Sequence, residues 1–413
     1  MEKTDSVRLR FSINLESLVP GGSGASRAPV MQGSTQPGTV PENFLDLSDI
    51  SFVLFDGDRR MLEVLEPTVT PQAGSDFAIY DVECEILDPY FTNAQSVSIE
   101  FYILVLANYS QYSPQNLHFA YRQTLSDLFD LTHPSFATPQ GSPWWYPRRE
   151  TPDESSGITP QAPQYIPMAG LQHYSIPTGT LSQQKIVLPD DIYMLRSMAK
   201  IEVIDRINAT GTGAATIQPD IDKRVSLKSV ELMGYYTRGT LLPEFSSWTT
   251  GRYPETQYVS SPFVPSFSYL NPPPYSARTP GSTGAWSRPF GYDAAATAAR
   301  TDGCRVYSVY LPEYAIPDPD QPLAAGSATD SELTNAWMRV TVHNPDGTAD
   351  APDVTFGLRL SEYVGGKAEG DDIPLLRNNI YRYEITDVST TLVNVVWTVC
   401  PMSTAEIEIP PFE

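Results

Sequence analysis

The sequence opens with a strict alternation of apolar and polar residues. The apolar positions fall on every second residue, at Val7, Leu9, Phe11, Ile13 and Leu15. This period of two is typical of a β-strand with one buried face, so we expect a core strand over residues 6–16. Glycine and serine then follow from Gly21, and we expect residues 20–42 to form an exposed, easily cut linker. A strand that we expect in the core is therefore joined to the rest of the chain by a segment that a protease could cut easily.

Length and composition predict two mostly β domains. The chain has 413 residues, more than one hydrophobic core usually serves. Its 38 prolines are spread along the chain and favour short strands joined by stiff loops. We expect two β-sandwich domains over residues 1–180 and 181–413, with long loops rich in proline and aromatic residues.

Several segments read as individual strands. Residues 50–65 predict a hairpin with a tight turn at Asp56, Gly57 and Asp58, and residues 97–109 predict a core strand. A second series of strands begins near residue 184. Residues 243–300 show little periodicity and exceed ordinary loop length, so they predict a long functional or disordered loop.

Charge and motifs exclude several classes of function. The formal net charge of −22 would repel a phosphate backbone, so we expect no nucleic-acid partner. The four histidines are scattered without metal-ligand spacing, and we expect no metal, no cofactor and no enzymatic activity. The three cysteines, Cys84, Cys304 and Cys400, predict small buried side chains, with a single disulfide left open.

Two segments place aromatic rings where loops are expected. Such rings can stack on sugars or on partner proteins, but most aromatic residues fill cores, and both interpretations stay open. The candidates for ligand contact are Trp144, Trp145, Tyr146, Trp248, Tyr253 and Trp286.

Short phrases along nearly the whole chain resemble one family, the FimA-like fimbrial subunits of type V pili in Bacteroidales. The phrases occur in the order and spacing of that family. They are SRA at 26–28, ISFVLFDGD at 50–58, YIPMAG at 165–170, LRSMAKIEV at 195–203, VYLPE at 309–313 and LLRNNIYRYEIT at 375–386.

The resemblance implies two transthyretin-like sandwiches, export to the cell surface and outer membrane as a lipoprotein, and assembly into a pilus that contributes to adhesion. An Arg-specific protease would cut between Arg27 and Ala28 and release the first strand, which until then occludes a groove. A lipobox cysteine is missing, so we expect the precursor's signal to lie outside this sequence. The long segment 243–300 and Cys400 do not map onto features of the family, which leaves shaft, tip, anchor and accessory roles open.

A strand from a neighbouring subunit would fill the emptied groove. The C-terminal residues 391–412 alternate in the required way, and the donor candidates are Val393, Val395, Trp397, Val399, Ile407 and Ile409. The expected partners are other pilus subunits, the protease, and a glycan or protein on a host or bacterial surface.

Two alternatives stand beside this interpretation. Residues 7–15 can be an ordinary N-terminal strand, with Arg27 an ordinary linker cation. The protein can also be a monomeric surface lipoprotein that binds glycans through its aromatic loops.

Overall fold

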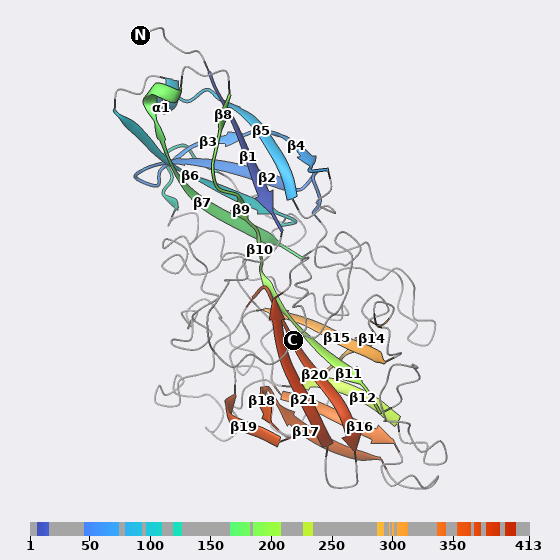
Figure 1. Cartoon of the computed structure of the whole chain (residues 1–413). Helices are drawn as coiled ribbons and strands as arrows, with labels where there is room; N and C mark the ends of the chain where they lie inside the picture. The colour runs from blue at the N-terminus through green and yellow to red at the C-terminus, as the bar shows by residue number, and fades with distance from the viewer. Residues whose placement is uncertain are drawn as a thin grey trace, which may run out of the picture.

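The chain is nearly all β in its computed structural model (Figure 1). The structure describes residues 6–15, 45–73, 79–92, 96–109, 119–125, 166–181, 185–207, 226–233, 287–292, 297, 300, 304–312, 337–343, 353–364, 367–372, 377–388 and 393–401. Its sheets are predominantly antiparallel, which confirms the all-β fold class. Among these residues, no helix is both long and apolar enough to cross a membrane.

Two sheets pack face to face in the N-terminal half. The first has the order β4-β5-β1-β8, with β9 also paired to β1, and the second has the order β10-β7-β6-β2-β3. Buried side chains from both sheets share one core. The strands are β1 (Val7–Asn14), β2 (Ile50–Asp56), β3 (Met61–Leu65), β4 (Thr68–Pro71), β5 (Ile79–Ile86), β6 (Ser98–Ala107), β7 (Met168–Pro177), β8 (Ile186–Val187), β9 (Ile192–Tyr193) and β10 (Leu195–Arg196), with the short helices α1 (Pro89–Thr92) and η2 (Thr178–Thr180).

The C-terminal half repeats this arrangement with its own core. One sheet has the order β14-β15-β11-β20-β21, a second has the order β13-β12-β16-β17, and β18 pairs with β19. The strands are β11 (Met198–Asp205), β12 (Ser226–Met233), β13 (Ser287–Pro289), β14 (Gly291–Tyr292), β15 (Arg305–Pro312), β16 (Trp337–His343), β17 (Val354–Arg359), β18 (Ser361–Val364), β19 (Lys367–Asp372), β20 (Asn379–Val388) and β21 (Val393–Pro401).

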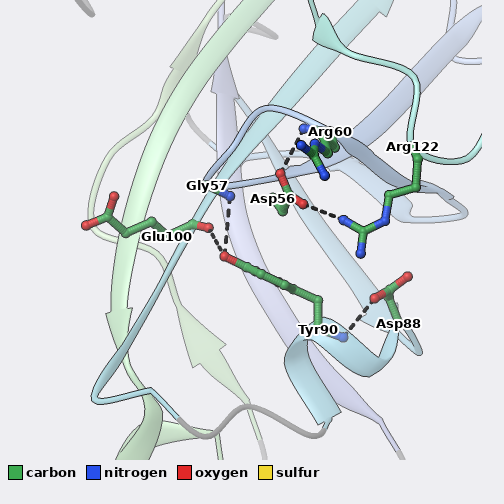
Figure 2. A network of polar contacts seen from close by, with 7 residues as sticks. All are labelled: Asp56, Gly57, Arg60, Asp88, Tyr90, Glu100 and Arg122. Carbon is green, nitrogen blue, oxygen red and sulfur yellow. Dashed lines mark hydrogen bonds and ion pairs between the residues drawn. The ribbon is translucent and has the colours of Figure 1, made fainter.

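The hairpin expected at residues 50–65 is confirmed as β2 and β3. Its turn is held by Asp56, whose carboxylate accepts hydrogen bonds from the Arg60 backbone N (2.8 Å) and from Arg122 Nη1 (2.7 Å). The Tyr90 hydroxyl donates to the Glu100 carbonyl (2.8 Å) and accepts from the Gly57 backbone N (3.3 Å), as Figure 2 shows. In the same figure, Asp88 accepts from the Tyr90 backbone N at the start of α1.

The long apolar run in residues 97–109 is also a core strand, β6, and the structure explains its composition. Ile103 and Val105 face the core between the two sheets. Leu104 and Leu106 belong to a second cluster on the opposite face, together with Leu125. A strand buried on both faces reads as a continuous apolar run rather than as an alternation.

Two expectations about segments differ from the structure. Residues 186–196, which we expected in the second domain, pair with β1 and β7 of the N-terminal half. The expected loop 243–300 contains β13 and β14 at residues 287–292. Strands of two or three residues are too short to show a period in the sequence. The division into two domains and the transthyretin-like topology stay predictions.

Candidate functional site: the slot of the first strand

The inward side chains of β1 and the residue that follows it are part of the core. Val7, Leu9, Phe11, Ile13 and Leu15 are each at most 2% exposed. Full burial of such a side chain contributes about 1.5–3 kcal/mol, so five contribute about 8–15 kcal/mol before opposing terms. This is comparable with the whole net stability of a domain, about 5–15 kcal/mol. We call the site that β1 occupies the strand slot.

The strand slot holds β1 along both edges. On one side β1 pairs antiparallel with β5 over its full length, from Val7 opposite Ile86 to Asn14 opposite Ile79. On the other side it pairs in parallel with β8 at Leu9 and Arg10, and with β9 further on. Figure 1 shows β1, in dark blue, inside its sheet. Emptying the slot would therefore leave unpaired backbone groups on three neighbouring strands, β5, β8 and β9.

The floor of the slot is apolar and contains a thiol. The rings of Phe11 and Phe52 meet edge to face with centroids 6.0 Å apart. Cys84 lies opposite Leu9 and is 7% exposed. Burial, together with the negative charge of Glu63, raises the pKa of the Cys84 thiol to about 12.

The C-terminal end of the slot is polar and buried. Asn14 Nδ2 donates to Asp191 Oδ2 (3.2 Å). Arg196, which is fully buried, donates through Nη2 to the Leu15 carbonyl (3.2 Å) and through Nη1 to Asn378 Oδ1 (2.9 Å). Arg196 thus connects the end of β1 to the residue before β20 in the C-terminal half.

The outer face of the slot is charged. Asp81, Glu83 and Glu85 alternate along β5 on the face opposite the core. Arg10 Nη2 lies 2.9 Å from Asp81 Oδ2, and Arg10 Nε lies 3.9 Å from Glu83 Oε1. Glu83 also forms an ion pair with Lys185, whose hydrogen bond and charge lower the pKa of Glu83 with help from Arg10.

A glycine brings the parallel edge of the slot close to the facing sheet. A Cβ on Gly170 of β7 would lie 2.7 Å from Ile192 Cγ2 and 2.8 Å from the Tyr193 carbonyl oxygen. Only the absence of a side chain at residue 170 lets β9 pass at this distance. Gly170 is the last residue of the YIPMAG phrase. The close approach of β9 explains why this position is a glycine.

The expected donor segment is divided by the structure. Val393, Val395, Trp397 and Val399 lie in β21, an edge strand that pairs with β20 along its length. Val395 is 1% exposed, within the chain's own C-terminal core. Ile407 and Ile409 lie outside the described residues.

The remaining expected site residues also lie outside the described part of the chain. They are Arg27 and Ala28 of the processing bond and the aromatic candidates Trp144, Trp145, Tyr146, Trp248, Tyr253 and Trp286. Their roles stay predictions. Among the described residues, no group of three or more His, Cys, Asp or Glu side chains is placed to hold a metal ion.

Sequence reasoning missed the polar end of the slot. Nothing in the residue types indicated that Asn14 would contact Asp191 or that Arg196 would reach the Leu15 carbonyl, because these pairs are 177 and 181 positions apart. Gly170 was the one available signal, since a glycine within a strand often marks a close backbone approach.

Comparison with known proteins finds similarity in structure but not in sequence. No family model and no curated protein matches the chain. Solved structures similar to it include fimbrial and cell adhesion proteins from Porphyromonas, Parabacteroides and Bacteroides. The tip fimbrial protein Mfa3 from Porphyromonas gingivalis covers 96% of this chain and 99% of its own, with 12% identity and a TM-score of 0.47.

Two further solved structures also match nearly the whole length of this chain. A fimbrial assembly protein from Parabacteroides distasonis covers 95% of this chain and 94% of its own, with 13% identity and a TM-score of 0.38. The fimbrial anchor protein Mfa2 from Porphyromonas gingivalis covers 97% of this chain and 100% of its own, with 9% identity and a TM-score of 0.32.

Proposed function

We propose that the protein is a non-enzymatic structural subunit of a cell-surface pilus, in which β1 is a temporary occupant of the strand slot. Cleavage between Arg27 and Ala28 frees β1, and a strand from a neighbouring subunit replaces it. The observation that carries the proposal is that β1 is an interior strand. Together with Leu15 it buries five side chains in the core, yet this segment continues into the rest of the chain only through residues 16–44.

Cutting this connection changes how firmly β1 is held. In the intact chain the linker keeps β1 near its slot at an effective concentration in the millimolar range. After cleavage β1 is held by non-covalent contacts alone and dilutes away once it dissociates. A strand supplied by another subunit can then compete for the same backbone edges and the same apolar floor.

The geometry of such an exchange builds a filament. The slot lies in the N-terminal half, while the candidate donor 391–412 lies at the far end of the sequence. A contact between different surfaces of successive subunits is heterologous, and it continues into an open chain instead of closing as a two-fold dimer. This supports a pilus at the cell surface, with a lipoprotein precursor and a role in adhesion as further parts of the proposal.

Within residues 391–412, the segment after residue 402 is the better donor. Removing β21 from β20 would break its pairing from Val388 to Asn379 and would uncover Val395. A donor drawn from residues 403–412 leaves every described strand pair of the C-terminal half intact.

Strand exchange after cleavage tests the proposal. The full chain and its Arg27→Ala variant are treated with an Arg-specific protease. The protease is then inhibited and removed, because residues 6–15 contain Arg8 and Arg10, and a labelled peptide of residues 6–15 is added in excess. Intact mass and fluorescence anisotropy are measured. The cleaved wild-type chain should begin at Ala28 and take up the labelled peptide, while the Arg27→Ala chain should keep its own β1 and take up none.

Two results would count against the proposal. One is a wild-type chain that remains uncut at Arg27. The other is a cut chain that never exchanges β1, because the slot would then be a permanent part of the fold.

A further inference from the structure

The outer face of the strand slot carries a pattern of charge that restricts which strand can occupy it. Asp81, Glu83 and Glu85 form a row of carboxylates along β5, which we call the acidic row. In the register of β1 they lie opposite Ser12, Arg10 and Arg8 respectively. The two arginines of β1 therefore face two of the three carboxylates across the sheet.

The contacts confirm that β1 compensates this charge. Arg10 forms the ion pair with Asp81 at 2.9 Å and lies within 3.9 Å of Glu83. Ser6 donates a hydrogen bond to Glu85. The strand next to β5 on its other side, β4, contributes uncharged Thr68 and Thr70 opposite Glu83 and Asp81.

Loss of β1 would leave the acidic row largely unbalanced. Lys185 would still contact Glu83, but the cations of β1 would be gone. Directly opposed side chains on one face of a sheet lie about 4.5–5.5 Å apart at Cβ, where opposite charges stabilise and like charges destabilise the pair. An incoming strand is therefore selected by its outward residues as well as by its apolar ones.

The chain's own C-terminal segment has the opposite pattern. If Ala405, Ile407 and Ile409 entered the slot, the alternation would turn Glu406 and Glu408 toward the acidic row. This holds for either direction of the strand, because the face of a residue depends only on the alternation. The sequence after Arg382 contains no lysine or arginine at all.

We propose that the strand slot of this protein accepts a strand with basic outward residues from a different subunit, and that it discriminates against the C-terminal strand of a second copy of this chain. The inference rests on the proposed function, since it assumes that β1 is exchanged. The protein would then belong to a mixed assembly, in which a subunit of another kind supplies the strand that fills its slot. It would not polymerise with itself.

Competition between peptides tests this inference. The full chain carries a site for a sequence-specific protease in place of residues 22–27, is cut there, and is offered labelled peptides. One pair is residues 6–15 and its Arg8→Glu, Arg10→Glu form. The second pair is residues 403–413 and its Glu406→Lys, Glu408→Lys form. Members of a pair share their apolar residues, so they differ only in outward charge.

The basic member of each pair should bind at least about fivefold more tightly than its acidic counterpart, since two opposed charge pairs change sign. In 1 M salt, where the Debye length falls to about 3 Å, this preference should shrink. A Glu83→Gln, Glu85→Gln chain should lose most of the preference. A Glu66→Gln chain should keep it, because Glu66 is exposed between β3 and β4, outside the acidic row.

The outcomes separate this inference from the proposed function. If no peptide enters the cut chain, not even residues 6–15, strand exchange itself is wrong. If peptides enter but both members of each pair bind equally, exchange stands and selection by charge is wrong. Self-assembly of the cut chain into polymers through its own C-terminal segment would also overturn the inference.

Discussion

The thiol of Cys84 lies opposite Leu9 on the floor of the strand slot, 7% exposed and with a pKa raised to about 12 by burial and by Glu63. Release of β1 would uncover it and return its pKa toward the ordinary value of about 8.5. We expect Cys84 to resist a maleimide in the intact chain and to react readily once the slot is emptied. Peptide mass mapping measures the labelling of each cysteine.

Cys304 serves as the internal control for this experiment. It is fully buried in the C-terminal half, in a cluster with Ile204 and Val306, and should stay unlabelled in both states. Equal labelling of Cys84 before and after cleavage would show that β1 does not leave. Labelling of Cys304 in step with Cys84 would indicate general unfolding.

A buried ion cluster around Glu202 contributes to the acid response of the C-terminal half. Burial disfavours the charged form of Glu202, but Lys200 Nζ (2.8 Å from Oε1) and Arg382 Nε (2.6 Å from Oε2) outweigh that effect and lower the pKa of Glu202 to about 2. A carboxyl group with a depressed pKa stabilises the fold above its unfolded pKa of about 4.3. That contribution is lost as pH falls from about 4.3 to about 2.

Glu202→Gln should therefore lower the free energy of unfolding by about 3–5 kcal/mol at neutral pH, because two cations lose their buried partner. The difference from wild type should narrow as pH falls toward about 2. Urea unfolding across this pH range measures it. The exposed Glu66→Gln variant should stay within about 0.5 kcal/mol of wild type throughout. A pH-independent cost for Glu202→Gln would contradict the assignment.

At the scale of elements, the parallel edge of the slot depends on how closely β9 crosses β7. Gly170→Ala would place a methyl group 2.7 Å from Ile192 Cγ2 and 2.9 Å from Met194 Sδ, so the segment 192–194 must move. We expect a loss of about 1–3 kcal/mol in unfolding free energy and faster exchange of β1 in the cut chain. Thermal unfolding and the rate of peptide uptake measure the two effects.

Gly179 provides the matched control, because a Cβ built there has no atom within 4 Å. Gly179→Ala should leave both the stability and the uptake of peptide close to wild type. If Gly170→Ala lowers stability but β1 exchanges at the wild-type rate, the parallel edge does not control the slot.

Elements with a strong local signal could be predicted from the sequence. The alternation in residues 7–15, the hairpin turn at Asp56 and the apolar run of β6 are each visible in the segment's own residues, because the buried faces of a strand decide which of its residues are apolar. The short strands β8, β9 and β10 could not be predicted. They have two residues each and exist only because β1 and β7 offer open edges to them.

The candidate site, too, could be predicted from the sequence only in part. Its apolar half follows from the period of β1, since the residues that alternate are the residues that are buried. Its polar half arises from contacts between residues more than 170 positions apart, such as Asn14 with Asp191 and Arg196 with the Leu15 carbonyl. A single sequence contains no local trace of such contacts, so these residues were found only in the structure.

At the scale of the whole molecule, one buried arginine links the slot to the C-terminal half. Arg196 donates both to the Leu15 carbonyl and to Asn378 Oδ1. The Asn378 backbone has φ of 64°, in the left-handed region that asparagine tolerates, and its N donates to the Met198 carbonyl (2.8 Å) at the start of β11. A change at the end of β1 thus reaches two strands of the second core through a short chain of hydrogen bonds.

This connection predicts that the C-terminal half senses whether the slot is filled. Emptying the slot removes the Leu15 carbonyl from a fully buried guanidinium, and the loss of a hydrogen bond to a charged group costs about 1.5–3 kcal/mol. Protection of the Asn378 amide against hydrogen exchange should fall by about 10- to 100-fold and should recover when the peptide of residues 6–15 is added. The amide of Val230, in the second sheet of that core, should keep its protection.

An Arg196→Lys chain separates this coupling from simple loosening of the fold. Lysine keeps the charge but its compact ammonium cannot hold two acceptors in the fixed fork that a guanidinium provides. The Asn378 amide should then exchange rapidly with the slot filled and should change little when it is emptied. If Arg196→Lys responds to emptying as strongly as wild type, or if wild type does not respond, the two halves are not coupled through this residue, and β1 acts on the N-terminal half alone.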